Sequence, residues 1–437
     1  MTNTNKRAKV QPDLVILVTG YGMTLNDSIR YKNGQLFVNS IAVADIVSQV
    51  GTPTYIYSLR RALNNFWSIR AAFADFDAHI HYSAKANANL SILKALIEAG
   101  AGIDCVSGGE IFRALKAGAK ASDIVYAGVG KTGNEILYAL EQGVGWFNVE
   151  NVDELHIINQ IAGNLGRDNI QIALRLNPDV TANTHPYIAT GHGGAKFGLT
   201  AEAIRHVLHE QHHFNKLTFK GLHVHIGSQL GDTNGTVEAV EKALELIAPY
   251  EHMKTLNIGG GIPAQYQADA ELPSAEDFAK AVKPLVQGYE ILLEPGRSII
   301  ADAGILVGEV LYTKQQAGQN LAIISASMTE LIRPALYQAT HDIVPLIRSD
   351  ADLQATQVVG PVCETSDVLG RDVMLPLLQT GDGVALLTAG AYGSVMASNY
   401  NARPRPAEVV VTADGESWFV ARERESWSDL IAHEVLE

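Results

Sequence analysis

The chain contains little cysteine and no long apolar run. Its 437 residues include only 2 cysteines, Cys105 and Cys363, too few for the disulfide framework of an extracellular chain of this length. We therefore expect a reducing compartment. No stretch approaches the roughly 18 consecutive apolar residues that a membrane-spanning helix needs. The sequence thus predicts a protein that does not bind membranes and lies in the cytoplasm.

Positive charge is also scarce. The chain has 33 Lys and Arg against 47 Asp and Glu, which gives a net charge of −14. Proteins that bind nucleic acid carry basic stripes, so this balance argues against a nucleic-acid partner. The composition, 47% hydrophobic and 18% charged, is otherwise that of an ordinary globular chain, long enough for more than one domain.

Strand-like and helix-like segments alternate from about residue 79 to about residue 297. There are eight strand-like runs, each but the last followed by a helical run. The first three helical runs end at Gly100, Gly118 and Gly143, as helices commonly do. Strands alternating with helices form right-handed βαβ units and a parallel sheet. Eight such strands favour an α/β fold, a closed (β/α)8 TIM-type barrel, over an open sheet.

A mainly β pattern follows the barrel. Runs such as GILVGEVLYT and AEVVVTADGESWFVARE succeed one another, and the DG pair predicts a hairpin in the second. Before the barrel, YKNGQLFV carries its own NG hairpin signal. We therefore expect an N-terminal segment (1–48) whose hairpin joins the β domain. The barrel would occupy residues 49–303 and a β-sandwich or barrel-like C-terminal domain residues 304–437.

Unusual polar residues recur at the ends of the predicted barrel strands, where catalytic groups of such barrels gather. Lys85, in HYSAKANANL, stands between two alanines, an unusual place for a surface lysine. His223 and His225 share one face of their strand. A metal pair is conceivable there, but no third ligand has convincing spacing, so hydrogen-bonded histidines are favoured. GGG at 259–261 is either a turn or an anion cradle, and EPGR at 294–297 is either a turn with an ion pair or a site.

Together these residue types match the needs of pyridoxal phosphate. A lysine amine can hold the aldehyde covalently, provided that burial or neighbouring charge lowers its pKa. Glycines can hold the phosphate, and a carboxylate facing the pyridine nitrogen keeps the ring able to accept electrons. We expect no metal. The cluster HEQHH at 209–213 is interpreted as a solvated helix end, and Cys105 as a packed thiol.

Eleven short motifs extend this pattern over nearly the whole chain. In order they are HYSAKAN, GIDCVSGGE, RLNPDV, THPYIATG, KFGL, HVHIGSQ, NIGGG, LEPGRS, IRPALY, CETSD and AGAYG. In these motifs the chain closely resembles the fold-type III, alanine-racemase-like decarboxylases, and within them the diaminopimelate decarboxylases. One departure is SASMTEL at 325–331, where many members read roughly DGGMNDL; it could alter a loop or a dimer contact.

The resemblance implies how pyridoxal 5′-phosphate is held. Lys85 would bind it covalently, His225 would stack on its ring, and Glu294 would pair with the pyridinium nitrogen. The remaining cofactor-binding residues would surround the phosphate: Ser228, Gly259, Gly260, Gly261 and Tyr392.

The resemblance also implies a substrate whose distal end carries a carboxylate beside an amine. The residues that would bind this small amino acid are Arg297, Arg333, Tyr337, Glu364 and Tyr392. Cys363 would be the acid that protonates the product carbon after carbon dioxide leaves. In the family Cys363 and Glu364 enter from the second subunit, so a homodimer with shared active sites is expected.

The implied activity is the decarboxylation of meso-2,6-diaminopimelate to L-lysine, the last step of lysine biosynthesis. Glu294 argues against a racemase, because relatives that racemise alanine have an arginine in this role. Arg297 and Arg333 argue against ornithine or lysine as substrate, because a buried guanidinium would be left unpaired. Decarboxylases of ornithine, lysine, carboxynorspermidine or a carrier-bound glutamyl group remain alternatives. So does a non-catalytic regulator, which typically loses the lysine or the site cysteine.

Overall fold

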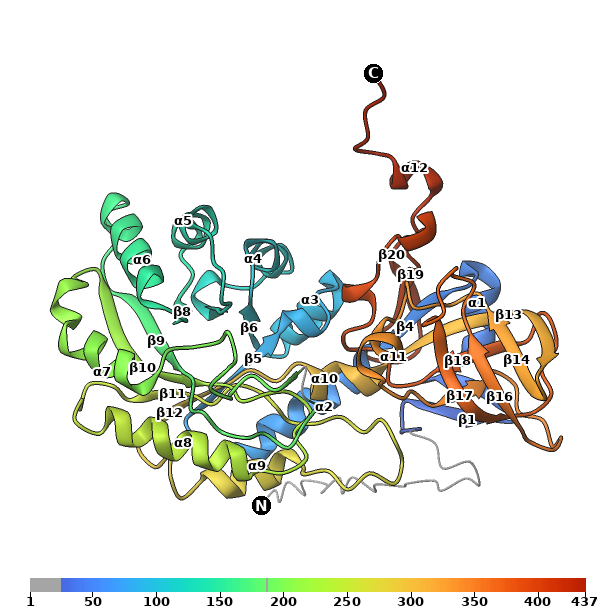
Figure 1. Ribbon diagram of the computed structural model, residues 1–437, viewed down its shortest axis with the longest axis horizontal. Coiled ribbons are helices and arrows are strands. Elements are labelled where there is room, and N and C mark those ends of the chain that lie inside the picture. Colours follow the sequence, from blue (N-terminus) through green and yellow to red (C-terminus); the bar gives the residue numbers. More distant parts are fainter. Residues whose placement is uncertain (1–24, 186–187) are drawn as a thin grey trace, which may run out of the picture.

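Two parts of the chain lie side by side in the computed structural model, a ring of strands wrapped by helices and a second part made mainly of strands (Figure 1). The structure describes residues 25–437 except 186–187. Half of the predicted N-terminal segment, residues 1–24, and part of the motif THPYIATG therefore lie outside the described residues. No helix in the described part is long and apolar enough to cross a bilayer.

The ring is a closed barrel of parallel strands. These strands are β5 (Ala78–Ser83), β6 (Gly102–Cys105), β7 (Ile124–Tyr126), β8 (Trp146–Val149), β9 (Ile170–Leu176), β10 (Leu217–Val224), β11 (Thr255–Asn257) and β12 (Glu290–Leu293). They pair in chain order, and β12 closes the ring by pairing with β5. The predicted (β/α)8 barrel is confirmed.

Helices cover the outside of the barrel (Figure 1). They are α2 (Leu59–Ala72), α3 (Leu90–Glu98), α4 (Gly108–Lys116), α5 (Gly133–Gln142), α6 (Val152–Asn164), α7 (Ala201–His209), α8 (Asn234–Ile247), α9 (Ala275–Val282) and the short α10 (Arg297–Ile300). The glycines predicted to end α3, α4 and α5 have φ angles of 95°, 102° and 83°, a left-handed conformation that glycine adopts without strain. At the other end of α5, Thr132 and Glu135 form a capping box.

The second part is built on one sheet of nine strands. Its strands are β4 (Thr54–Ser58), β13 (Gly304–Gln316), β14 (Gln319–Ile324), β15 (Ile343–Pro345), β16 (Gln354–Val359), β17 (Val368–Leu375), β18 (Gly383–Leu386), β19 (Ala407–Val411) and β20 (Trp418–Arg422). The predicted hairpin joins β19 to β20. The helices of this part are α1 (Val43–Val50), α11 (Arg333–Tyr337) and α12 (Trp427–Leu430). The mainly β second domain is confirmed.

One detail differs from the sequence prediction. Strand β4, which the predicted limit at residue 49 assigns to the barrel, pairs with β13 and β19 instead. Its five residues are all buried, and the sequence of so short a buried strand does not reveal which sheet it will join. The N-terminal strands β1 (Ile29–Lys32), β2 (Gln35–Val38) and β3 (Ile41–Ala42) form a small sheet of their own. It packs on the larger sheet through a shared apolar core, so the predicted inclusion of the N-terminal hairpin in the β domain is confirmed. The remaining domain limits stay predictions.

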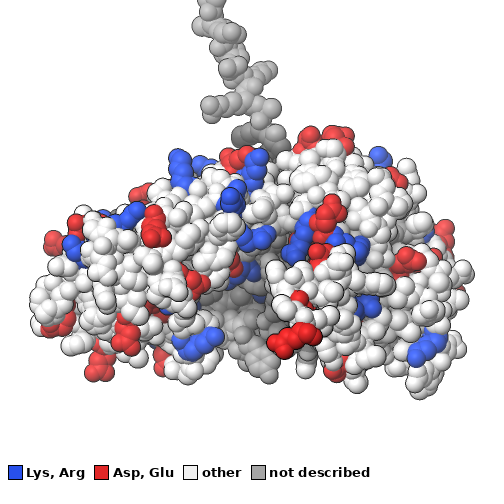
Figure 2. Space-filling model, turned by 90° about the horizontal axis from the view of Figure 1, so that it is seen from above, with Lys and Arg blue, Asp and Glu red and all other residues white. Residues whose placement is uncertain are grey.

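The surface is hollowed between the two parts when the molecule is seen from above (Figure 2). On this face acidic and basic side chains are interspersed, and several basic side chains gather along the hollow. A small anion that approaches the hollow therefore meets positive charge.

Gly221 on β10 is a position where the barrel admits no side chain. A Cβ atom there would lie 1.6 Å from the backbone oxygen of Thr255 on β11. We expect Gly221→Ala to lower the free energy of unfolding by about 3 kcal/mol or more, because the two strands would have to separate. Gly130→Ala is the matched control, since no atom lies within 4 Å of its Cβ position. Thermal unfolding followed by circular dichroism measures both. Equal melting temperatures for the two variants would contradict this account.

Candidate active site

Buried polar side chains from several strands meet inside one end of the barrel. They are Asp104 on β6, Asn148 on β8, Arg175 on β9, His223 on β10, Asn257 on β11 and Glu294 just after β12. Side chains alternate along a strand, so every second residue of these short strands points into the ring. Burying so many polar groups costs stability unless they are paired, which marks this layer as functional.

Glu294 is the best-connected member of this layer. Its Oε1 accepts hydrogen bonds from Asn148 Nδ2 at 2.8 Å and from Asn257 Nδ2 at 2.6 Å. Its Oε2 lies 3.3 Å from His223 Nε2. Burial by itself would raise the pKa of Glu294, but His223, Lys85 and Asn257 outweigh it and hold the pKa well below its usual value. The carboxylate is therefore ionised, and Oε2 is the oxygen less occupied by the protein.

Lys85 lies on the single turn η1 (Ala84–Ala86) that follows β5. Its Nζ is 3.5 Å from Asp104 Oδ2, and 36% of its side chain is exposed, so the amine can be reached from the barrel mouth. Burial tends to lower the pKa of Lys85, but Asp104 outweighs it and the pKa is raised. From the sequence we expect a lowered pKa for this amine. The pKa is raised instead, because Asp104 lies beside the amine. The second oxygen of Asp104, Oδ1, is buried without a hydrogen-bond partner.

The glycines at 259–261 bring two loops of the site together. A Cβ on Gly259 would lie 2.6 Å from His225 Nδ1, and one on Gly260 would lie 2.5 Å from the backbone oxygen of Glu294. The Gly260 N–H donates to His225 Nδ1 at 3.2 Å, and the Gly259 N–H donates to the side chain of Asn257. Burial and Lys85 hold the pKa of His225 well below its usual value, so the imidazole is neutral.

Arg297 lies at the start of α10 and is buried. Its Nε donates to Ser228 Oγ at 3.0 Å, and its Nη1 donates to the hydroxyl of Tyr266 at 2.9 Å. Its guanidinium carbon also lies 4.7 Å from the centre of the Tyr392 ring. Neutral oxygens and aromatic faces, rather than an acid, surround this charge.

Arg333 on α11 is buried in the same way. Its Nη1 is 2.8 Å from His341 Nε2, and its guanidinium lies 4.3 Å from the Tyr266 ring. Burial and Arg333 lower the pKa of His341 to about 3, so the ring is neutral and its Nε2 can accept. Arg333 Nε has no hydrogen-bond partner. Among the described residues, the ion pairs include neither Arg297 nor Arg333. Two buried cations without a counter-ion mark a site for an anion.

The described chain does not bring Cys363 and Glu364 into this group. Both are exposed on the loop between β16 and β17. The Cys363 N–H donates to Asn401 Oδ1 at 2.9 Å, and the buried Asp367 accepts from the neighbouring Val362 N–H. No described hydrogen bond or ion pair joins either residue to Lys85 or to the buried arginines. The loop thus presents both side chains to solvent.

Two groups of histidines, the pair at 223 and 225 and the cluster at 209–213, lie beside other side chains. His223 faces Glu294, and its ring centre is 6.5 Å from that of His225. At the end of α7, His213 Nε2 lies 3.0 Å from Glu210 Oε2. One ligand atom from each of Glu210, His212 and His213 lies within 4.8 Å of the others, with both histidines exposed. An exposed ion-paired helix end agrees with the sequence interpretation of this cluster.

Several residues of the site were not proposed from the sequence. They are Asp104, Asn148, Asn257, Tyr266 and His341. The first three could have been found from the sequence, since each is a polar residue within an otherwise apolar strand-like segment. The segments are GIDCVS, GWFNVE and TLNIGGG. Tyr266 and His341 lie in irregular segments, where no periodic pattern could indicate which way a side chain points.

Comparison with known proteins defines the class. Residues 59–301 match the family model described as "Pyridoxal-dependent decarboxylase, pyridoxal binding domain". This match covers more than half of the chain, begins directly after β4 and contains Lys85, His225, the glycines and Glu294. The chain is a pyridoxal-phosphate-dependent decarboxylase, as the sequence predicted.

Relatives that match over nearly the full length of the chain show which family of decarboxylases it belongs to. Diaminopimelate decarboxylase from Vibrio cholerae is 43% identical over 93% of this chain and 99% of its own. The structure of the Helicobacter pylori enzyme complexed with L-lysine has a TM-score of 0.85 at 38% identity, covering 90% of this chain and 98% of that one. The corresponding L-lysine complex from M. jannaschii has a TM-score of 0.88 at 35% identity, covering 94% and 98%. The protein belongs to the diaminopimelate decarboxylase family.

The unpaired charge on Arg333 predicts an unusual stability response. We expect Arg333→Met to keep or raise the melting temperature of the substrate-free protein, because replacing a buried charge by an apolar side chain of similar length is often neutral or stabilising by about 1 to 4 kcal/mol. Arg61→Met is the matched control. Arg61 lies 2.6 Å from Asp302, so its loss should lower the melting temperature. A fall in Arg333→Met as large as in Arg61→Met would contradict the prediction.

Proposed function

We propose that this protein decarboxylates meso-2,6-diaminopimelate, releasing carbon dioxide and L-lysine. The observation that carries the substrate assignment is the pair of buried arginines, Arg297 and Arg333, that lack counter-ions. Diaminopimelate has a second carboxylate to fill this place, whereas ornithine and lysine do not. A substrate without it would leave buried charge unpaired, which sites of this kind discriminate against strongly. The names of the full-length relatives support the same substrate.

Pyridoxal 5′-phosphate, when bound, supplies an electron sink for the carbon that loses its carboxylate. Three features of the site fit this group: the reachable amine of Lys85, the unpartnered Oδ1 of Asp104, and glycines whose places admit no Cβ. We assign Lys85 the covalent link to the cofactor and His225 the ring face. We assign the binding of its phosphate to Ser228, Gly259, Gly260, Gly261 and Tyr392.

Two carboxylates at the site have different tasks, because their surroundings move their pKa values in opposite directions. Glu294, whose pKa is lowered, would hold a proton on the ring nitrogen of the cofactor through Oε2. Asp104 is buried and lies near the negative charge of Glu294. Burial and this neighbouring charge both raise the pKa of Asp104. Asp104 can therefore accept the proton that Lys85 must lose before its amine reacts with an aldehyde.

The distal end of the substrate would be held by residues from two chains. Arg297, Arg333 and Tyr337 would bind its carboxylate. Cys363 would donate a proton to the product carbon, and Glu364 would bind the distal ammonium. Because the last two side chains are exposed on their loop, we infer that they complete the site of a second copy in a homodimer. We also propose a cytoplasmic location, which the low cysteine content supports.

The substrate is tested by carbon dioxide release from purified protein loaded with pyridoxal phosphate. Offered meso-diaminopimelate, D,D-diaminopimelate, lysine and ornithine separately, it should release carbon dioxide from the meso isomer alone. Lys85→Ala should abolish this release. Arg333→Met should raise the KM for the meso isomer by about 100-fold, the usual loss when a charge-assisted hydrogen bond is removed. Release from ornithine or lysine instead would refute the substrate assignment.

The shared site is tested by mixing two inactive variants. Lys85→Ala and Cys363→Ala should each have little activity alone. After unfolding and refolding together, about half of the dimers are mixed, and each mixed dimer has one intact site, so about a quarter of wild-type activity should return. A refolded mixture of Lys85→Ala with Lys85→Met is the control. If activity does not return although size analysis shows mixed dimers, Cys363 acts in its own chain.

A further inference from the structure

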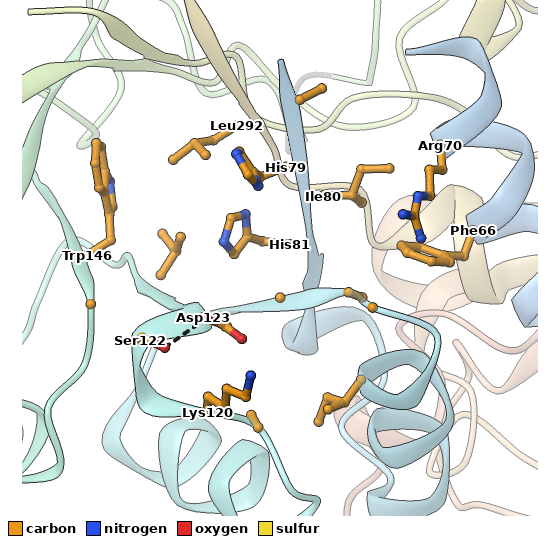
Figure 3. Close-up of a pocket in the computed structure, with 18 of the residues that line it drawn as sticks. Phe66, Arg70, His79, Ile80, His81, Lys120, Ser122, Asp123, Trp146 and Leu292 are labelled. Carbon is orange, nitrogen blue, oxygen red and sulfur yellow. Dashed lines mark hydrogen bonds between the residues drawn. The ribbon is translucent and has the colours of Figure 1, made fainter. Parts of the chain in front are cut away.

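The amino-terminal ends of the barrel strands enclose an open cavity of about 620 Å³ (Figure 3). Its walls come from the first residues of β5, β6, β8, β9 and β12, with parts of α2 and of the loop before β7. Lys85 and Glu294 follow the carboxyl-terminal ends of β5 and β12. The cavity is therefore at the opposite end of the barrel from the active site.

A small apolar layer separates the cavity from the active site. Val125, Trp146, Ala173 and Leu292 form a separate buried cluster inside the barrel. Three of them, Val125, Trp146 and Leu292, also line the cavity. The cavity is thus closed at its inner end by packed side chains and is open only away from the active site.

Glycine keeps space at the cavity wall. A Cβ on Gly102 would lie 2.4 Å from the His81 ring, and one on Gly145 would lie 2.3 Å from the backbone oxygen of Ser122. The ring of His81 lies in the middle of the view in Figure 3, with Trp146 on one side and Arg70 on the other. His81 Nδ1 is buried without a hydrogen-bond partner. A ligand group placed here would satisfy a polar atom that the protein leaves unpaired.

Several charged side chains that line the cavity have no oppositely charged partner among the described residues. Arg70 and Lys120 line it with side chains that are exposed at its mouth, and among the described residues neither takes part in an ion pair. Arg70 Nη1 donates one long hydrogen bond, 3.4 Å, to the backbone oxygen of Ala99. On the acidic side, Glu290 is paired with His79 at 3.3 Å. Asp123 accepts only from the Ser122 hydroxyl, at 2.9 Å.

We propose that this cavity is a second ligand site and that it binds an acidic α-amino acid, of the aspartate or glutamate type. Two unpaired cations, Arg70 and Lys120, match two carboxylates, and the unpaired Asp123 matches the α-ammonium. Figure 3 places Arg70 across the cavity from Lys120 and Asp123, so the two carboxylates would bind on opposite walls. A guanidinium binds a carboxylate with two parallel hydrogen bonds. The apolar part of the ligand would lie along Trp146.

This site is connected to the active site by two hydrogen bonds. The indole Nε1–H of Trp146 donates to Asn148 Oδ1 at 3.0 Å. The same amide group of Asn148 donates through Nδ2 to Glu294 Oε1 at 2.8 Å. A ligand that moves the indole would therefore change one of the two amide hydrogen bonds that hold Glu294. The element that couples the two sites is the orientation of a single side-chain amide.

Binding is tested by titration calorimetry on the full-length protein loaded with pyridoxal phosphate. L-glutamate or L-aspartate should bind with saturation, one molecule per chain. Arg70→Ala and Lys120→Ala should each weaken this binding about tenfold or more, the usual loss of a charged hydrogen-bond partner. Lys280→Ala, which removes an exposed lysine of α9 outside the cavity, is the matched control and should bind normally. Binding must also persist in Arg333→Met, since a ligand in the active site would be weakened there.

Two outcomes would overturn the site. One is the absence of saturable heat with both acidic amino acids. The other is binding that survives Arg70→Ala and Lys120→Ala but is lost in Arg333→Met, which would place the ligand in the active site. Tighter binding of succinate than of L-aspartate would exclude a role for Asp123 and refute the amino-acid assignment.

The coupling has its own measurement. Addition of the bound amino acid should shift the near-visible absorbance of the cofactor in the wild-type protein, because the hydrogen bonding of Glu294 changes. Trp146→Phe keeps an aromatic ring but removes the N–H donor, so this variant should bind the amino acid without the shift. A shift of equal size in Trp146→Phe, or no shift in the wild type at saturation, would show that the indole does not connect the two sites.

Discussion

The active site depends on keeping one carboxylate ionised inside the barrel. Glu294 loses most of its contact with water, which by itself would protonate it. It remains charged because Asn148, Asn257 and His223 reach it from three other strands. An unpartnered buried charge costs several kcal/mol, so the position of each of these strands in the closed ring is tied to Glu294. The arrangement that keeps Glu294 ionised, and to which we assign the ring nitrogen of the cofactor, is thus also a constraint on the fold.

The two buried arginines, to which we assign the distal carboxylate of the substrate, have surroundings of the opposite kind. Arg297 and Arg333 are buried against tyrosine rings and a neutral histidine rather than against acids. Aromatic faces attract a cation only weakly compared with a carboxylate. A protein carboxylate here would stabilise the free chain but would occupy the place of the ligand. On the proposed assignment, the unpaired arginines lower the stability of the free chain and let the site discriminate between substrates with and without a second carboxylate.

The two ends of the barrel differ because an apolar layer lies between them. The polar layer around Glu294 holds that carboxylate with two hydrogen bonds and the nearby His223, whereas the cavity at the other end has exposed charged groups at its rim. Trp146 belongs to both regions, since its ring lines the cavity and its N–H reaches Asn148. A small movement at one end of a packed barrel can therefore be felt at the other without a change of fold.

The barrel, the mainly β second domain and the places of Lys85 and Glu294 at strand ends could be predicted from the amino-acid sequence alone. These predictions rest on hydrophobic periodicity, on glycines that follow helices, and on the rule that catalytic groups follow the carboxyl ends of barrel strands. All three are local features of the amino-acid sequence. Tertiary structure decided that Asn148 and Asn257 hold Glu294, that β4 joins the second sheet, and that Asp104 raises rather than lowers the pKa of Lys85. Each of these depends on which distant segments become neighbours in the folded chain. The spacing of residues along the sequence does not reveal these contacts, because they form only when the barrel closes.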